Sequence, residues 1–121
     1  TISKLIKDNL IESCHDISLG GILIAASKMC IKSKKGIKIN NLKNLINKFE
    51  YFFSEDQGRY LVEINKDNFK KVEKVLIDNS VHFDELGVVN NDKFLFSDEI
   101  NLSIEDLIKA YKNWLKKYMV N

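Results

Sequence analysis

The sequence predicts an α+β fold in which helices pack on a mixed β-sheet, within a single domain spanning residues 1–121. Short apolar segments of strand character alternate with segments whose apolar residues follow the helical period. An Asn-Asn-Asp sequence at 90–92 separates two apolar runs, as in a β-hairpin. With 121 residues and 45% hydrophobic content, the chain has the usual size of one domain and can form a core.

The first half of the chain begins with Ile2, Leu5 and Leu10 at helical spacing. Residues 22–30 are apolar on nearly all sides, which is typical of a buried helix, and Ser18 is a candidate cap for it. We therefore expect a helix over 2–10, a strand over 11–17, a helix over 22–30, a strand over 36–39 and a helix over 40–49.

The second half contains the most amphipathic segment, and its last helix begins at a pair resembling a capping box, Ser103 and Asp106. Asn and Asp tolerate positive φ, so 90–92 suits a tight turn. We expect a strand over 59–64, a helix over 66–79, a strand over 81–89 that includes His82, a return strand over 93–96 and a helix over 103–119. The aromatic side chains expected in the core are Phe49, Tyr51, Phe52, Phe53 and Trp114, and the stripe of the last helix adds Leu107, Tyr111, Leu115 and Tyr118.

Charge and composition exclude several classes of function. Basic and acidic residues number 19 and 17 and are spread along the chain, so no basic block favours nucleic acid. No apolar run approaches the roughly 18 residues of a membrane span, and no signal peptide is visible. Cys14 and Cys30 are expected to be reduced thiols of a cytoplasmic protein. His15 lies beside Cys14, but no second pair with ligand spacing follows, so we expect no metal site.

The first chemistry-bearing segment leads from His15 and Asp16 through Gly20 and Gly21 into the buried helix. Such a turn presents backbone N–H groups at a helix N-terminus, where anions including phosphate are favoured. Many strand-to-helix turns carry two glycines for steric reasons alone, and His15 can simply pair with Asp16.

The second segment, 54–59, places Ser54, Glu55, Asp56, Gln57 and Arg59 together. Arg59 is the only arginine, and its planar guanidinium makes bidentate contacts that lysine cannot make. Ser54, Gln57 and Arg59 can bind a polar ligand, and Glu55 with Asp56 could hold a divalent cation. The alternative is a structural salt bridge beside a strand.

The two segments in this order resemble phosphoribosylformylglycinamidine synthase, and more narrowly the last domain of its synthetase subunit. The resemblance rests on His-Asp-Ile-Ser-x-Gly-Gly at 15–21, Phe-Ser-Glu-Asp-Gln-Gly-Arg-Tyr-Leu-Val at 53–62 and Trp-Leu-x-x-Tyr-Met at 114–119. It implies the C-terminal domain type shared with aminoimidazole ribonucleotide synthetase, which has α/β/α layers and is partly ferredoxin-like.

The resemblance also implies an ATP-dependent ligase that converts formylglycinamide ribonucleotide and glutamine-derived ammonia to formylglycinamidine ribonucleotide. This chain would be its C-terminal, second-half domain, as the start at Thr1 within a helical pattern also suggests. Upstream domains would bind most of the ATP and magnesium, and a glutaminase subunit and a small accessory subunit would be partners. No catalytic residue is carried over. Residues 54–59 would be the counterpart of a substrate segment in the first half, facing an auxiliary site.

The candidates for an auxiliary anion site or an interface are therefore Ser54, Glu55, Gln57, Arg59, Gly20, Gly21, His15 and Asp16. The chain departs from the family at Leu19, where Asp is usual, which puts a polar role of that turn in doubt. Two alternatives stay open. One is a stand-alone module that binds a phosphate, a nucleotide or another protein, and the other is a related aminoimidazole ribonucleotide or selenophosphate synthetase domain. An apolar face is expected where the domain meets its neighbours.

Overall fold

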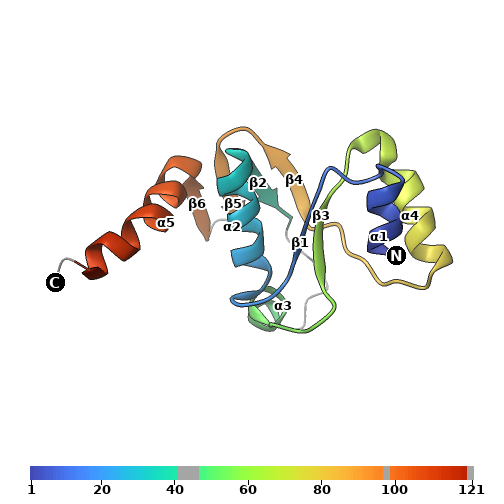
Figure 1. The fold of residues 1–121 in the computed structure, drawn as a ribbon, viewed down its shortest axis with the longest axis horizontal. Coiled ribbons are helices and arrows are strands. Elements are labelled where there is room, and N and C mark those ends of the chain that lie inside the picture. Colours follow the sequence, from blue (N-terminus) through green and yellow to red (C-terminus); the bar gives the residue numbers. More distant parts are fainter. Residues whose placement is uncertain (41–46, 97–98, 120–121) are drawn as a thin grey trace.

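The structure, a computed structural model, describes residues 1–40, 47–96 and 99–119. Its fold is α+β with a mixed sheet, as predicted (Figure 1). The helices are α1 (Ile2–Lys7), α2 (Gly21–Ser33), α3 (Lys48–Phe53), the 3₁₀ turn η1 (Lys66–Asn68), α4 (Phe69–Asp78) and α5 (Ile104–Met119). The strands are β1 (Ser13–Asp16), β2 (Gly36–Ile39), β3 (Tyr60–Glu63), β4 (Gly87–Asn90), β5 (Lys93–Phe96) and β6 (Ile100–Ser103).

The larger sheet has the strand order β4-β2-β5-β6. Strand β2 is antiparallel to β4 and parallel to β5, so it lies between the two strands that flank residues 90–92. The predicted hairpin of the segments before and after 90–92 is therefore wrong, because the two strands do not pair with each other. The start of β5 lies very close to Gly36 of β2, where a Cβ atom would lie 2.1 Å from the carbonyl oxygen of Lys93.

Helix α2 lies at the centre of the main core. It contacts β2 as well as β1 and β3, which form a separate antiparallel pair, and it also contacts α3 and α5. Its residues on several sides are buried, as the apolar run predicts. The buried members of this core are Ile17, Ile22, Leu23, Ala25, Ala26, Cys30, Ile39, Phe52, Phe94, Phe96 and Ile104.

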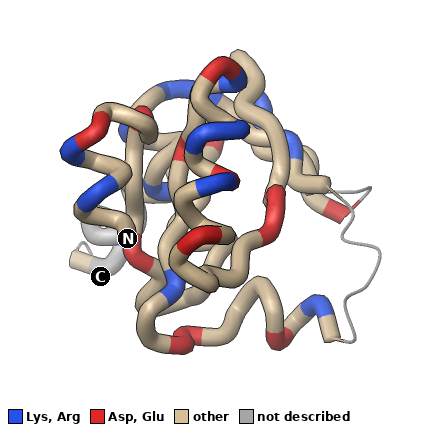
Figure 2. Tube along the Cα trace, turned by 90° about the vertical axis from the view of Figure 1, so that its right-hand side faces the viewer, with Lys and Arg blue, Asp and Glu red and all other residues tan. Residues whose placement is uncertain are grey.

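A second, smaller core joins α1 to α4. Leu5, Val72 and Leu76 are buried in it, and Ile64 after β3 packs against them. Figure 1 shows these two helices side by side, beyond β3 from α2. The stripe of apolar residues three and four apart on α4 accounts for this packing. In Figure 2, lysines and acidic residues are interspersed along the trace on this side of the molecule.

Several predicted elements differ from the structure. Residues 81–86 form no regular element, so the strand expected over 81–89 is confined to Gly87–Asn90 and His82 lies outside it. Strand β6 was not predicted. Helix α3 begins after Asn47, whose side chain accepts hydrogen bonds from the N–H groups of Phe49 and Glu50, and most of the helix expected over 40–49 lies outside the described residues.

The aromatic residues of α3 are only partly in the core. Phe52 is 2% exposed and packs edge-on against Phe96, but Phe49 and Phe53 are 66% and 50% exposed. A spacing of four residues places Phe49 and Phe53 on one face of α3, where their rings stack, while Phe52 is turned into the core. The prediction that all of these side chains are core is wrong for this pair.

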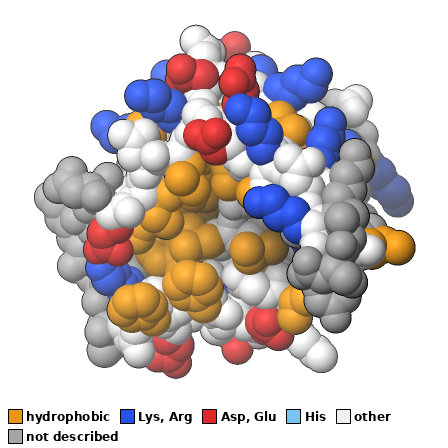
Figure 3. Space-filling view, turned by 90° about the vertical axis from the view of Figure 1, so that its left-hand side faces the viewer, with side chains coloured by type: hydrophobic (Ala, Val, Ile, Leu, Met, Phe, Trp, Pro, Cys, Tyr) orange, Lys and Arg blue, Asp and Glu red, His pale blue; other side chains and the backbone are white. Residues whose placement is uncertain are grey.

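Apolar side chains are also exposed on α2, which contacts α3, and on α5, which contacts α2. Ile24 is 42% and Tyr111 57% exposed. Viewed from the side of α5, hydrophobic side chains gather in a hollow on the surface (Figure 3). Tyr111 was expected in the buried stripe of α5, and its exposure shows that this prediction is wrong. The side chains of Trp114, Leu115 and Tyr118 lie outside the described residues. Among the helices of the described residues, none combines the length and apolarity needed to cross a membrane.

Candidate functional site

The pairing of β1 with β3 brings the two chemistry-bearing segments to the same end of that sheet. Asp16 lies opposite Tyr60, and the N–H of Ile17 donates to the carbonyl oxygen of Arg59 at 2.9 Å. The turn before α2 therefore faces the turn before β3. This proximity results from strand register, which sequence periodicity does not specify.

An open groove of about 410 Å³ lies between the two turns. Four of the eight predicted site residues line it: Asp16, Glu55, Gln57 and Arg59. His15, Gly20 and Ser54 are adjacent in sequence to its lining, and Gly21 lies two residues after Leu19. The remaining lining residues are Ile17, Ser18, Leu19, Gly58 and Tyr60.

The N-terminus of α2 is closed by a carboxylate of the same chain. Gly20, in the left-handed region at φ +84°, is the N-cap residue, so the predicted cap Ser18 is wrong. The N–H of Gly20 donates to Glu55 Oε1 at 2.8 Å, and the N–H of Gly21 donates to the carbonyl oxygen of Ser18 at 3.0 Å. Glu55 thus supplies the negative charge that a helix N-terminus favours.

Gly21 is required by close packing as well as by its conformation. It has φ +70°, and a Cβ atom there would lie 2.4 Å from the carbonyl oxygen of Phe52. The end of α3 therefore rests against the first turn of α2. The glycine pair serves backbone geometry, which is the steric alternative considered from the sequence.

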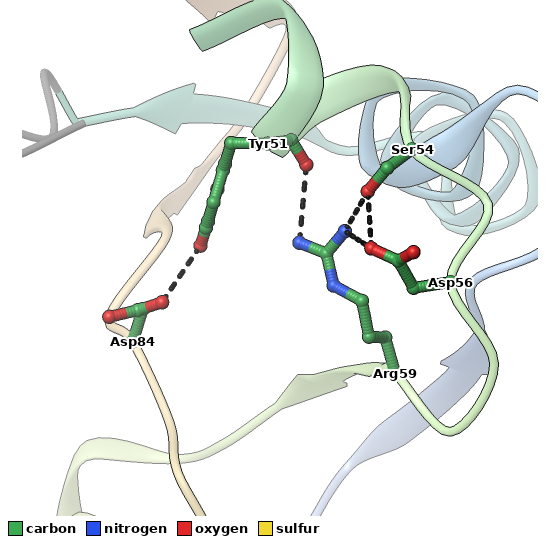
Figure 4. Close-up of polar contacts among 5 residues, drawn as sticks. All are labelled: Tyr51, Ser54, Asp56, Arg59 and Asp84. Atoms are coloured by element: carbon green, nitrogen blue, oxygen red, sulfur yellow. Dashed lines mark hydrogen bonds and ion pairs between the residues drawn. The ribbon is translucent and has the colours of Figure 1, made fainter. Parts of the chain in front are cut away.

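Arg59 ties the polar segment to α3 (Figure 4). One terminal nitrogen, Nη1, donates to Ser54 Oγ at 2.7 Å and lies 3.7 Å from Asp56 Oδ2, while Nη2 donates to the carbonyl oxygen of Tyr51 at 3.1 Å. Ser54 Oγ donates in turn to Asp56 Oδ2 at 2.8 Å. The guanidinium thus has several partners in its own chain, which matches the structural alternative for this residue.

Tyr51 extends this network to the segment after α4. Its hydroxyl donates to Asp84 Oδ2 at 3.2 Å, and its ring lies 5.1 Å from the guanidinium carbon of Arg59. Burial, together with the negative charge of Asp84 and the hydrogen bond to it, raises the pKa of Tyr51 to about 12, although Arg59 acts in the opposite direction. His82 Nε2 lies 3.6 Å from the same Asp84 oxygen.

Sequence reasoning did not assign Tyr51 or Asp84 to the site. Tyr51 belongs to a run of aromatic residues that indicates core packing, and its carbonyl oxygen carries no sequence signal. Asp84 lies in a segment expected to be a strand. Their contact joins residues 33 positions apart, and only the tertiary fold establishes it.

The remaining candidate, His15, pairs locally. Its Nδ1 lies 2.5 Å from the carbonyl oxygen of Asp16 and 3.7 Å from Asp16 Oδ1, so the imidazole interacts with its neighbour. Cys14 is a free thiol near the surface, and partial desolvation together with the charge of the nearby Asp16 raises its pKa. Burial and the charge of Glu63 raise the pKa of Cys30 to about 11, so neither thiol is an activated nucleophile.

The acidic residues do not form a metal site in the described part of the chain. No group of three or more His, Cys, Asp or Glu side chains there is arranged to hold a metal ion. Glu55 turns to Gly20, whereas Asp56 turns to Ser54 and Arg59, so the two carboxylates have different partners. The described residues therefore do not fit a magnesium ion held jointly by this pair.

Residues 1–98 match the family model described as "AIR synthase related protein, C-terminal domain". The chain therefore belongs to this family. It is 56% identical over all 121 residues to the phosphoribosylformylglycinamidine synthase subunit PurL of Pelagibacter ubique, and 37% identical over 120 residues to the same subunit of Bartonella bacilliformis. These findings confirm the resemblance seen in the sequence.

A solved structure, Thermotoga maritima PurL complexed with FGAR, has the same fold. Its TM-score is 0.72 at 16% sequence identity, over 87% of this chain and 19% of that chain. PurL of the same organism complexed with ATP matches equally well, with a TM-score of 0.72. This chain spans about a sixth of the curated relatives, covering 17% of the Pelagibacter protein and 16% of the Bartonella protein.

Proposed function

We propose that residues 1–121 are the C-terminal, second-half domain of the synthetase subunit of a phosphoribosylformylglycinamidine synthase. The observation that carries this proposal is the 56% identity with Pelagibacter PurL along the whole chain. The complete enzyme would be an ATP-dependent ligase of purine biosynthesis in the cytoplasm. It would convert formylglycinamide ribonucleotide to formylglycinamidine ribonucleotide with ammonia released from glutamine by a glutaminase subunit, and a small accessory subunit would complete the complex.

Within that enzyme, the domain would have a framework role and no catalytic residue. The contacts of Glu55 with Gly20 and of Arg59 with Ser54 and Tyr51 support this role, because these polar groups hold α2, α3 and β3 together. ATP and magnesium would bind mainly through upstream domains. The exposed rings of Phe49 and Phe53 would pack against those domains, since stacked apolar side chains on a surface often mark an interface.

A domain exchange tests the assignment. The matching segment of Pelagibacter PurL is replaced by residues 1–121, and the chimera is expressed in a purine auxotroph that lacks its own subunit. We expect growth without purines and ATP-dependent amidine formation by the purified complex. A chimera carrying Phe52→Asp, which places a charge in the core, is the matched negative control. Failure of a stably folded, correctly assembled chimera would contradict the assignment.

A second variant separates the framework role from catalysis. Gln57 is exposed and lines the groove, so Gln57→Ala removes a polar group without opening the core. The chimera with Gln57→Ala is expected to keep kcat and KM within about twofold, a change of less than about 0.5 kcal/mol. A loss of a hundredfold in kcat would instead place this groove in the catalytic site.

A further inference from the structure

We propose that the groove between Asp16–Leu19 and Glu55–Tyr60 is a docking site for a basic, lysine- or arginine-containing segment of a protein partner. This interaction surface goes beyond the proposed function. Nothing in the framework role requires it.

The groups of the groove that could bind an anion already have partners within the chain. The N–H of Gly20 is bonded to Glu55, and that of Gly21 to Ser18. The guanidinium of Arg59 is directed to Ser54, Asp56 and Tyr51 (Figure 4). A phosphate or carboxylate entering the groove would have to displace these partners.

The charged side chains that line the groove do not balance. The groove is lined by two carboxylates, Asp16 and Glu55, and by one guanidinium whose charge is partly met by Asp56. The side chain of Asp16 is 71% exposed and so remains accessible to a partner, although His15 lies beside it. The lining therefore carries one more negative than positive charge, and because Glu55 is bonded to Gly20, Asp16 is the carboxylate that a cation would meet.

Two exposed side chains with apolar surface, Leu19 and Tyr60, also line the groove. Leu19 is 77% and Tyr60 51% exposed, and both line the groove beside the carboxylates. Lysine and arginine bury the methylene groups of their side chains on such surfaces while their charged ends stay near acids and water. The Tyr60 ring also favours a cation above its face.

The test uses the longest natural chain that contains residues 1–121, labelled with ¹⁵N, and a capped peptide of alternating lysine and glycine. We expect chemical-shift changes confined to Asp16–Leu19 and Glu55–Tyr60, and weaker binding as salt is added. Asp16→Asn and Leu19→Ala should each weaken binding by about threefold, the size expected of one exposed contact. Asp78→Asn at the end of α4 is the matched control and should leave binding unchanged.

Three outcomes would overturn the proposal, provided that circular dichroism shows the variants folded. The first is no binding of the lysine peptide, or binding that maps to other residues. The second is equal binding of the same peptide with glutamate in place of lysine. The third is a shift of the groove resonances by inorganic phosphate at lower concentration than by the peptide. None of these outcomes bears on complementation by the chimera, so the two proposals fail separately.

Discussion

The carboxylate of Glu55 accepts a 2.8 Å hydrogen bond from the backbone N–H of Gly20, and so a side chain from beyond α3 caps α2. The contact spans 35 positions of sequence, and Glu55 also lines the groove. It also explains why the turn can carry leucine at position 19, since the negative charge at this helix terminus comes from elsewhere in the chain.

Replacing Glu55 by Gln keeps an acceptor oxygen but removes its charge. We expect the free energy of unfolding to fall by about 0.5–1 kcal/mol, the usual worth of a charge at a helix N-terminus. Urea denaturation followed by circular dichroism measures it. Glu12→Gln, on an exposed acid outside the helices, is the control and should change stability by less than about 0.5 kcal/mol. Equal effects of the two substitutions would show that the cap is unimportant.

Replacing Arg59 by Lys tests whether the planar guanidinium is needed. A lysine ammonium cannot span Ser54 and the carbonyl oxygen of Tyr51 with two separate nitrogens. Since the side chain is only 26% exposed, the free energy of unfolding should fall by about 1–3 kcal/mol. A Lys variant as stable as the parent in chemical denaturation would rule out the structural role.

The raised pKa of Tyr51 predicts that the free energy of unfolding depends on pH in the alkaline range. Its pKa in the folded protein is raised to about 12 from the usual 10.0, so above pH 10 the unfolded chain loses this proton more readily than the folded one. The contribution to stability is therefore complete below pH 10 and is lost as the pH rises from 10 to 12. Unfolding measured across this range should show a decline that is smaller in Tyr51→Phe. An identical slope in the two proteins would contradict the raised pKa.

Two glycines in the left-handed region form a matched pair. Gly58, at φ +80°, has open space where a Cβ would lie, so Gly58→Ala should cost only the conformational penalty of about 1–2 kcal/mol. Gly21→Ala adds the clash with Phe52 and Phe53 and should cost about 3 kcal/mol or more. Thermal unfolding of both variants gives the comparison, and equal melting temperatures would show that α3 moves away from α2 at no cost.

Local sequence patterns were sufficient to predict the helices whose buried faces follow directly from the spacing of their apolar residues. The all-round apolar run gave the buried helix α2, and the stripe on α4 gave its inward face with Val72 and Leu76. Ser103 and Asp106 pair at the start of α5 as expected: Ser103 Oγ accepts from the backbone N–H of Asp106, and it donates to Asp106 Oδ2.

Strand partners could not be predicted in this way. The turn signal at 90–92 is real, since the Asn90 side chain accepts from the N–H groups of Asp92 and Lys93. A turn fixes only the direction of the chain, however, and β2 takes the place between the two strands because of contacts with residues far away in sequence. For the site, the residue types predicted which segments carry polar groups. They did not predict that those polar groups bond mainly to one another within the chain.

The central position of β2 has a consequence for synthesis. Both of its neighbours, β4 and β5, are translated long after it, so the emerging chain carries β2 with two unpaired edges until residues 87–96 have left the ribosome. Unpaired apolar strand edges promote aggregation. A nascent chain that stops before β5 cannot assemble the four-stranded sheet, and completion of that sheet therefore waits until β5 and β6 have been translated.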